Sequence, residues 1–169
     1  MDYFEHFGIP WSFCPDLSLV RKKYLTISRT AHPDLNVSEF DSEQKEDLTA
    51  YNNTAYATLN NEDKLFPYLL QLHGISLNDV PLAQSFLLEM MEFNEEVEDI
   101  KLHGSPEALV QAEDKIRLLQ QQLRSSLQAT LTKYEEGNKE EAITEVANYC
   151  LKINYLNRLL SNLQGKREL

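Results

Sequence analysis

The side chains that could hold a metal or move a proton are four histidines and a cluster of acidic residues. The histidines are far apart in the chain, at His6, His32, His73 and His103. None stands in a His-x-x-x-His or Glu-x-x-His spacing, which would place two metal ligands, or an acid and a base, on one face of a helix. We therefore predict no catalytic and no metal-binding residue. An enzyme built on these groups is kept as the alternative that tightly bound metal would support.

The two cysteines, Cys14 and Cys150, show no Cys-x-x-Cys spacing. They predict neither a zinc site nor a disulfide framework, and two thiolates are too few for an iron–sulfur cluster. The chain also lacks a glycine-rich loop that would cradle phosphates. We expect two reduced thiols, with Cys150 in a core, and a protein that uses no cofactor and itself binds neither ATP nor a cluster.

The most specific short motif is His32-Pro33-Asp34. Pro33 ends the helix predicted before it, so the three residues should be displayed in a loop between two helices. Because proline restricts the backbone, a histidine and a carboxylate would be presented with little ordering cost on binding. The plainer interpretation is a helix cap and a chain reversal, for which proline and aspartate are common.

Two helices are predicted around this loop. They cover residues 16–31 and 41–60 and should pack as an antiparallel hairpin. The side of the first helix that faces the second should carry Leu17, Val20, Tyr24, Ser28 and Ala31. On the opposite side, Lys22 and Arg29 form a basic stripe that leads into the loop.

A second part of the chain begins after Gly74, where turn-forming residues at 75–81 interrupt the helical periodicity. Three more helices are predicted, at residues 82–102, 106–135 and 138–164. Their short connections make neighbouring helices antiparallel, which predicts a three-helix bundle. The expected fold is all-α, with the hairpin in residues 1–74, a linker at 75–81 and the bundle in 82–169.

The first bundle helix carries more apolar residues than one core needs. At about 100° per residue, one complete core stripe is formed by Phe86, Met90, Phe93, Val97 and Ile100. Leu87, Leu88 and Met91 point away from this stripe. They either form a binding surface or are covered within the protein, by its first part or in a wide bundle groove.

Carboxylates border this second apolar patch. Glu92, Glu95 and Asp99 lie beside it, and the stretch from Glu89 to Asp99 holds six acidic residues and no basic one. A partner should therefore offer lysine or arginine.

In the last helix the predicted core stripe comprises Val146, Tyr149, Ile153, Leu156 and Leu160. Tyr155 should project to roughly the opposite side and would extend the patch.

Charge and composition favour a cytoplasmic, protein-binding role. The chain has 16 Lys and Arg against 27 Asp and Glu, and the net charge of -11 opposes non-specific attraction to nucleic acid or anionic lipid. No apolar run approaches the roughly 20 residues that span a bilayer. The sequence Met1-Asp2-Tyr3-Phe4-Glu5 lacks the basic character of an export or transit segment. We expect neither nucleic acid nor membrane as a partner.

Over about residues 1–65 the chain resembles the J domain of co-chaperones. The resemblance rests on four matches: His32-Pro33-Asp34, Asp2-Tyr3-Phe4 with Phe7-Gly8-Ile9, Tyr24 eight residues before His32, and Asn53-Thr54-Ala55-Tyr56-Ala57-Thr58-Leu59. In that family the loop and the basic face bind a DnaK-type chaperone ATPase and stimulate its hydrolysis. The chaperone-binding residues that the resemblance implies are His32, Pro33, Asp34, Lys22 and Arg29.

Within this resemblance, Asp34 would pair with an arginine of the chaperone, a directional contact that Lys22 and Arg29 would help to orient. Ala31 departs from the family pattern, which usually has an aromatic residue there. The departure bears on hairpin packing or docking and leaves the motif intact.

Nearly the whole chain resembles the HscB family, J-domain co-chaperones of iron–sulfur cluster biogenesis. Beyond the opening Met1-Asp2-Tyr3-Phe4, the match rests on Leu69-Leu70-Gln71-Leu72-His73-Gly74 and on Phe86-Leu87-Leu88-Glu89-Met90-Met91-Glu92-Phe93-Asn94-Glu95-Glu96-Val97. In that family the bundle binds an IscU-type scaffold protein and presents it to an HscA- or DnaK-type chaperone. The scaffold-binding positions that the resemblance implies are Leu87, Leu88, Met91, Glu92, Glu95, Asp99 and Tyr155.

The resemblance also implies a bacterial cytoplasmic form. Eukaryotic relatives can carry an N-terminal targeting segment and cysteine pairs, and neither is present in this sequence. Two alternatives keep the J domain but change the role of the bundle, which would bind a different client or serve as a dimerisation surface. Binding to the scaffold would separate these alternatives.

Overall fold

A computed structural model of the chain describes residues 1–30 and 42–165. In these residues the regular secondary structure is helical, in the order α1 (Tyr3–Phe7), α2 (Leu17–Thr30), α3 (Ser42–Leu59), α4 (Glu62–Leu72), α5 (Gln84–His103), α6 (Pro106–Glu135) and α7 (Lys139–Gln164). The chain divides into two compact units, Met1–His73 and Gly74–Leu169. The predicted all-α fold, a J-domain hairpin followed by a three-helix bundle, is confirmed. Helices α1 and α4 were not predicted.

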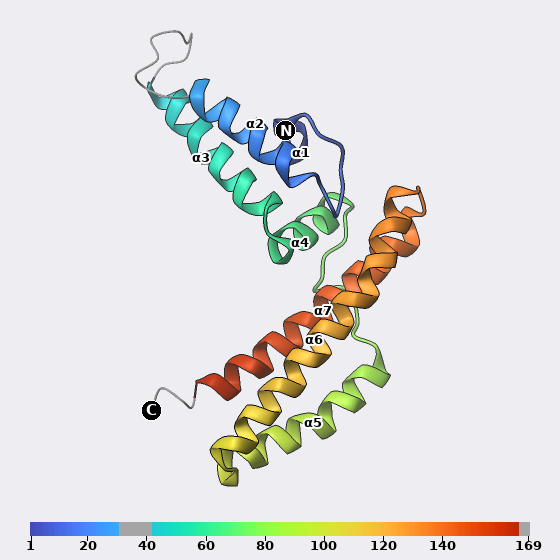
Figure 1. The fold of residues 1–169 in the computed structure, drawn as a ribbon. Coiled ribbons are helices and arrows are strands. Elements are labelled where there is room, and N and C mark those ends of the chain that lie inside the picture. Colours follow the sequence, from blue (N-terminus) through green and yellow to red (C-terminus); the bar gives the residue numbers. More distant parts are fainter. Residues whose placement is uncertain (31–41, 166–169) are drawn as a thin grey trace. The chain divides into compact units, whose positions relative to one another are not determined.

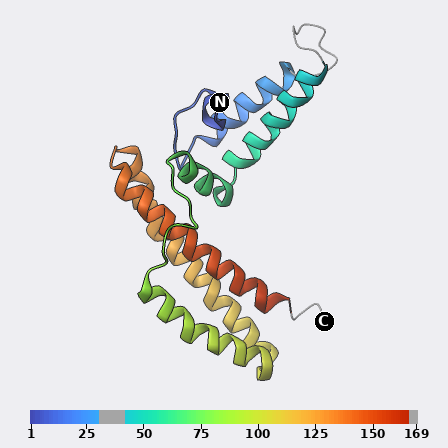
Figure 2. The ribbon, with the colours of Figure 1, turned by 180° about the vertical axis from the view of Figure 1, so that it is seen from behind.

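The first unit is built on the α2–α3 hairpin, whose two helices lie side by side in both views (Figures 1 and 2). Helix α4 packs against α3 near the end of the hairpin away from the 31–41 connection, and α1 lies against the middle of the hairpin, where His6 meets Asn52 (Figure 1). The buried apolar side chains come from all four helices and the α1–α2 connection: Phe4, Phe7, Phe13, Val20, Ala55, Leu59, Leu65, Phe66, Leu69 and Leu70. The aromatic residues of α1 and α4 therefore complete a core that two helices alone would leave open.

Helix α1 is only five residues long and depends on its caps. The Asp2 side chain accepts hydrogen bonds from the backbone N–H groups of Phe4 and Glu5, while the Glu5 carboxylate accepts one from the Asp2 N–H, which completes a capping box. Gly8 ends the helix at φ 61°, a left-handed conformation that costs glycine little. Two caps and two buried phenylalanines stabilise a helix too short to persist alone.

The inward side of α2 differs from the prediction at its start. Val20 is buried as expected, but Leu17, predicted to face α3, is 51% exposed. Leu17 is the first residue of α2, and the Asp16 carboxylate caps this turn by accepting from the N–H groups of Ser18 and Leu19. The buried contact with the rest of the unit begins one turn later, at Val20.

One polar side chain, Asn52 of α3, is buried in the hairpin. Its amide nitrogen donates to the Tyr24 carbonyl oxygen at 3.2 Å and to Ser28 Oγ at 3.0 Å, both on α2. Its Oδ1 lies 3.0 Å from Nε2 of His6 on α1. An amide oxygen only accepts, so His6 Nε2 is the donor in this pair. Asn52 thus joins three helices and fixes the register of α2 against α3.

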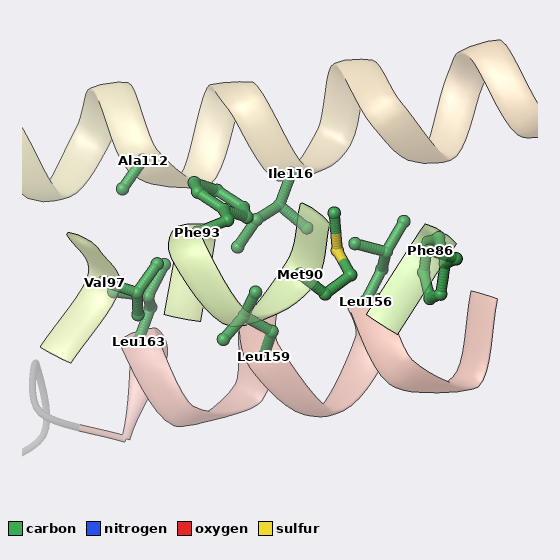
Figure 3. Packing of buried hydrophobic residues seen from close by; sticks show 9 residues of the cluster. All are labelled: Phe86, Met90, Phe93, Val97, Ala112, Ile116, Leu156, Leu159 and Leu163. Atoms are coloured by element: carbon green, nitrogen blue, oxygen red, sulfur yellow. The ribbon is translucent and has the colours of Figure 1, made fainter. Parts of the chain in front are cut away.

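In the second unit, α6 and α7 form a long antiparallel hairpin, and α5 lies along the half of it that is farther from the α6–α7 turn (Figures 1 and 2). Figure 3 shows the core cluster between the three helices. Its buried members are Phe86, Met90, Phe93 and Val97 of α5, Ala112 and Ile116 of α6, and Leu156, Leu159 and Leu163 of α7. Cys150 is also buried, as predicted.

The buried face of α7 is only partly the predicted stripe. Val146 and Leu156 are buried, whereas Tyr149, Ile153 and Leu160 are partly exposed. The first half of α7 buries Ala142, Val146, Ala147 and Cys150, and the second half buries Leu156, Leu159 and Leu163. On a helical wheel the centres of these two sets differ by roughly 130°. The reason is that the second half of α7 packs against α5 as well as α6.

An ion-paired group holds the α6–α7 turn. Lys133 Nζ lies 2.8 Å from the Glu141 carboxylate and 3.6 Å from that of Glu145, and Thr130 donates a short hydrogen bond to Glu145. The hydrogen bond from Lys133 is the main reason that the pKa of Glu141 lies below its ordinary value of 4.5. The same bond raises the pKa of Lys133.

We expect Asn52→Ala to lower the free energy of unfolding of the first unit by about 2 kcal/mol, because it leaves buried polar partners unsatisfied. The matched change Asn53→Ala removes an exposed acceptor of the Tyr24 hydroxyl and should cost less than about 1 kcal/mol. Trp11, the only tryptophan in the chain, lies in this unit, so chemical denaturation followed by its fluorescence measures the effect. Equal losses for the two variants would contradict this role of Asn52.

We expect Glu141→Gln to make the acid sensitivity of the bundle shallower. A carboxyl whose pKa is lowered on folding stabilises the folded state above its unfolded pKa, and this contribution is lost as the pH falls through the folded value. Melting temperatures from circular dichroism, compared at about pH 7 and about pH 3.5, should therefore fall less in Glu141→Gln than in the wild type. Glu140→Gln, which removes the same charge one residue earlier, is the control and should behave as the wild type.

Candidate protein-binding surfaces

The packing of α5 leaves an apolar surface outside the core. Its core-facing residues point between α6 and α7 (Figure 3). Leu87, Leu88 and Met91 are 39%, 58% and 59% exposed, although Phe86 and Met90 beside them are buried. Neighbouring positions on a helix differ by about 100°, so burial of one stripe turns these three side chains outward. Their expected position outside the core of the bundle is confirmed.

Contacts of two glutamates show which helix lies on each side of α5. The Glu96 carboxylate lies 2.7 Å from Nζ of Lys115 on α6, and Glu89, about 20° from Glu96 on the helical wheel, lines a groove formed mainly with α6 and also with Lys152 and Leu156 of α7. Leu87 and Met91 stand roughly opposite these glutamates on the helical wheel. These two apolar side chains therefore border α7.

Tyr155 of α7 lies at the boundary between α5 and α7, in an orientation that was not predicted. Its ring lies edge-on to Phe86, with 5.9 Å between the ring centroids, and it packs against the core cluster. The prediction that Tyr155 projects away from the core is wrong, because the inward side of α7 has turned toward Leu159 at this level. The half-buried ring occupies the α5–α7 boundary, on the side that Leu87 and Met91 border. We call the surface formed by Leu87, Leu88, Met91 and Tyr155 the bundle patch.

The acidic residues of α5 differ in whether they form ion pairs. Glu96 is paired with Lys115, and Glu98 is 2.9 Å from Lys101 in the next turn. Glu92, Glu95 and Asp99 are exposed, and no described lysine or arginine lies within ion-pair distance of them. These three carboxylates form the acidic rim of the bundle patch and are available to a basic partner.

The structure adds one residue that the sequence analysis missed. The guanidinium of Arg158 lies over the Tyr155 ring, 5.9 Å from its centroid. The spacing of three residues along α7 would have indicated this neighbour, because side chains three or four apart share a helix face. The bundle patch therefore has an acidic edge on α5 and a cation on α7.

The second candidate surface lies on the hairpin of the first unit. Lys22 and Arg29 are both exposed on α2, about 20° apart on the helical wheel, and roughly opposite the buried Val20. The predicted chaperone-binding residues of the loop, His32, Pro33 and Asp34, lie outside the described residues, as does Ala31. The basic stripe is in place on the helix that leads to them.

Neither surface resembles a metal centre. Across residues 1–30 and 42–165, no three histidine, cysteine or carboxylate side chains gather where they would hold a metal ion. In the same residues, no helix has the length and apolar character needed to cross a membrane. What the geometry offers is a basic helix face in one unit and an apolar surface with charged edges in the other, which is the chemistry of protein recognition.

The fold is that of a J-domain protein that carries a C-terminal three-helix bundle. Comparison with known proteins agrees. The family profile described as the HSCB C-terminal oligomerisation domain matches residues 82–164. The chain is 36% identical to a co-chaperone protein HscB homolog of Vibrio cholerae, over 80% of this chain and 82% of that protein.

Solved structures of HscB proteins are similar to nearly all of this chain. The chaperone HscB from Vibrio cholerae superposes with a TM-score of 0.69 and 30% identity, covering 99% of this chain and 98% of the other. The human co-chaperone protein HscB gives a TM-score of 0.71 and 26% identity, covering 99% and 82%. The chain therefore belongs to the HscB family of co-chaperones.

Adjacent methionines test whether the bundle patch is dispensable for folding. Met90→Ala should lower the free energy of unfolding of the bundle by about 3 kcal/mol, because Met90 is 2% exposed and its loss leaves a cavity. Met91→Ala should change it by less than about 0.5 kcal/mol. Denaturation followed by far-UV circular dichroism measures both, and Trp11 fluorescence checks that the first unit is unaffected. A large loss for Met91→Ala would show that the patch is covered within the protein.

Proposed function

We propose that this protein bridges two partners. The bundle holds an IscU-type scaffold protein, on which iron–sulfur clusters are built, and the J domain brings an HscA- or DnaK-type chaperone to it and stimulates that chaperone's ATPase. The protein has no catalytic role of its own and works in the bacterial cytoplasm, in keeping with its similarity to the Vibrio relative. The observation that carries the proposal is the bundle patch in a member of a co-chaperone family: an exposed apolar surface edged by carboxylates that pair with no lysine or arginine of the described residues.

The patch suits a protein partner for physical reasons. Leucine, methionine and tyrosine side chains supply apolar contact area at its centre, where binding energy is usually concentrated. The carboxylates of Glu92, Glu95 and Asp99 would attract a basic partner and orient it, while adding less to affinity because they remain hydrated. The partner chaperone would be met separately, by His32, Pro33 and Asp34 with Lys22 and Arg29.

The test is steady-state ATP hydrolysis by a purified HscA- or DnaK-type chaperone, with and without a purified IscU-type scaffold. We expect the wild-type protein to stimulate hydrolysis and the scaffold to increase that stimulation. His32→Gln should abolish stimulation by removing a chaperone contact. Leu87→Ala/Met91→Ala should keep the basal stimulation but lose the increase from scaffold, and should weaken direct scaffold binding by about tenfold or more.

The matched control is Leu118→Ala, which truncates an equally exposed leucine on α6, the helix on the other side of α5 from the bundle patch. It should behave as the wild type.

Stimulation of ATP hydrolysis that is the same with and without the scaffold would indicate a J-domain protein with another client. A mass of two chains by light scattering, reduced to one by Leu87→Ala/Met91→Ala, would instead make the patch a dimerisation surface, the use that the description of the matching family profile suggests. No stimulation of any chaperone tested would overturn the proposal.

A further inference from the structure

The edges of the bundle patch differ in the sign of their charge. On α5 the rim consists of carboxylates at Glu92, Glu95 and Asp99. On α7 the group that borders the patch is the guanidinium of Arg158, over the ring of Tyr155. A partner that is simply basic would gain from the first edge and would be repelled by the second.

Arg158 is positioned by an aromatic ring and has no ion-pair partner among the described residues. Its contact with the Tyr155 ring is a cation–π interaction, which restricts the long side chain at little cost in hydrogen bonds. Of the residues that the structure describes, no carboxylate lies within 4 Å of this guanidinium. Arg158 therefore presents a positive charge beside the bundle patch, in a chain whose net charge is -11.

We propose that Arg158 is a specificity-determining residue that binds a carboxylate of the scaffold protein seated on the bundle patch. This inference rests on the proposed function. A guanidinium carries five N–H donors in a fork that matches a carboxylate, and stacking on Tyr155 presents that fork with part of its ordering entropy already lost. With carboxylates on α5 and a cation on α7, the scaffold docks in one orientation, its basic side toward α5 and its acidic side toward α7.

The inference is testable because Arg158→Glu should change the affinity for the scaffold in opposite directions, depending on whether the scaffold presents positive charge or a carboxylate to Arg158. If the scaffold presented only positive charge to this surface, replacing Arg158 by glutamate would remove a repulsion and tighten binding. If a scaffold carboxylate faces Arg158, the same replacement sets two negative charges against each other and weakens binding. The sign of the change decides between the two.

The experiment is calorimetric titration of a purified IscU-type scaffold protein into the full chain, with Arg158→Glu, Arg158→Lys and Arg117→Glu as variants. We expect Arg158→Glu to weaken binding about tenfold and Arg158→Lys, which keeps the charge but lacks the planar fork, to weaken it about threefold. Arg117→Glu makes the same charge change on an exposed residue of α6, about 200° around the helix from Lys115, which faces α5. It should leave the affinity unchanged or slightly raise it.

Binding by Arg158→Glu that equals or exceeds that of the wild type would overturn the inference, as would an equal loss in Arg117→Glu. The proposed function is judged separately in the same titrations. If the wild type binds and Leu87→Ala/Met91→Ala does not, an unaffected Arg158→Glu removes only the role of Arg158. If the wild type fails to bind the scaffold, both proposals fall. Replacing scaffold Asp and Glu residues by Lys one at a time should find a variant that restores binding to Arg158→Glu.

Discussion

The burial of one face of α5 between α6 and α7 is the interaction on which the binding geometry of the bundle rests. Four residues of α5 enter the core cluster, and this fixes the rotation of the helix about its axis. Since side chains radiate at about 100° intervals, the directions of all the others are then fixed as well. Leu88 and Met91 are held outward by contacts that they do not make themselves. A binding surface obtained in this way is rigid, which lowers the entropy lost when a partner docks.

The same rotation determines which acidic side chains of α5 form ion pairs. Glu96 faces α6 and pairs with Lys115. The Lys115 ammonium also lies over the ring of Phe93, 4.3 Å from its centroid. Glu92 and Asp99 are carried outward, where no described basic group reaches them. The acidic residues of α5 thus fall into two groups, those with an ion-pair partner among the described residues and those without one. The second group forms the acidic rim of the bundle patch.

The candidate surface of the first unit is built differently, on a helical hairpin and not on a bundle face. Asn52 hydrogen-bonds to α2 and lies against His6 of α1, and the rings of Tyr24 and Tyr56 stack with 4.3 Å between their centroids. These contacts lie between the two helices that enter and leave the 31–41 connection. They set the separation and the register of α2 and α3, and they place Lys22 on the exposed side of α2. The two units thus present two separate candidate surfaces, which is what the proposed bridging role requires.

Much of this architecture could be read from the residues alone. Helical periodicity predicted α2, α3 and the three bundle helices, because long amphipathic segments carry their own signal. Periodicity could not predict α1, whose five residues are too few, or α4, where Pro67 stands inside the helix. Both depend on burial against the hairpin: Phe4 and Phe7 in one case, and the apolar residues around Pro67 in the other.

For the binding surfaces, local sequence was enough where a single helix carries the pattern, as for the outward direction of Leu88 and Met91 and for the acidic rim. It was not enough where two helices meet. The position of Tyr155 depends on how far the buried side of α7 turns between its two halves, and the partner of Glu96 depends on which helix lies beside it. A helical wheel describes one helix with a fixed inward direction. Contacts between helices set that direction, and only the packed bundle supplies them.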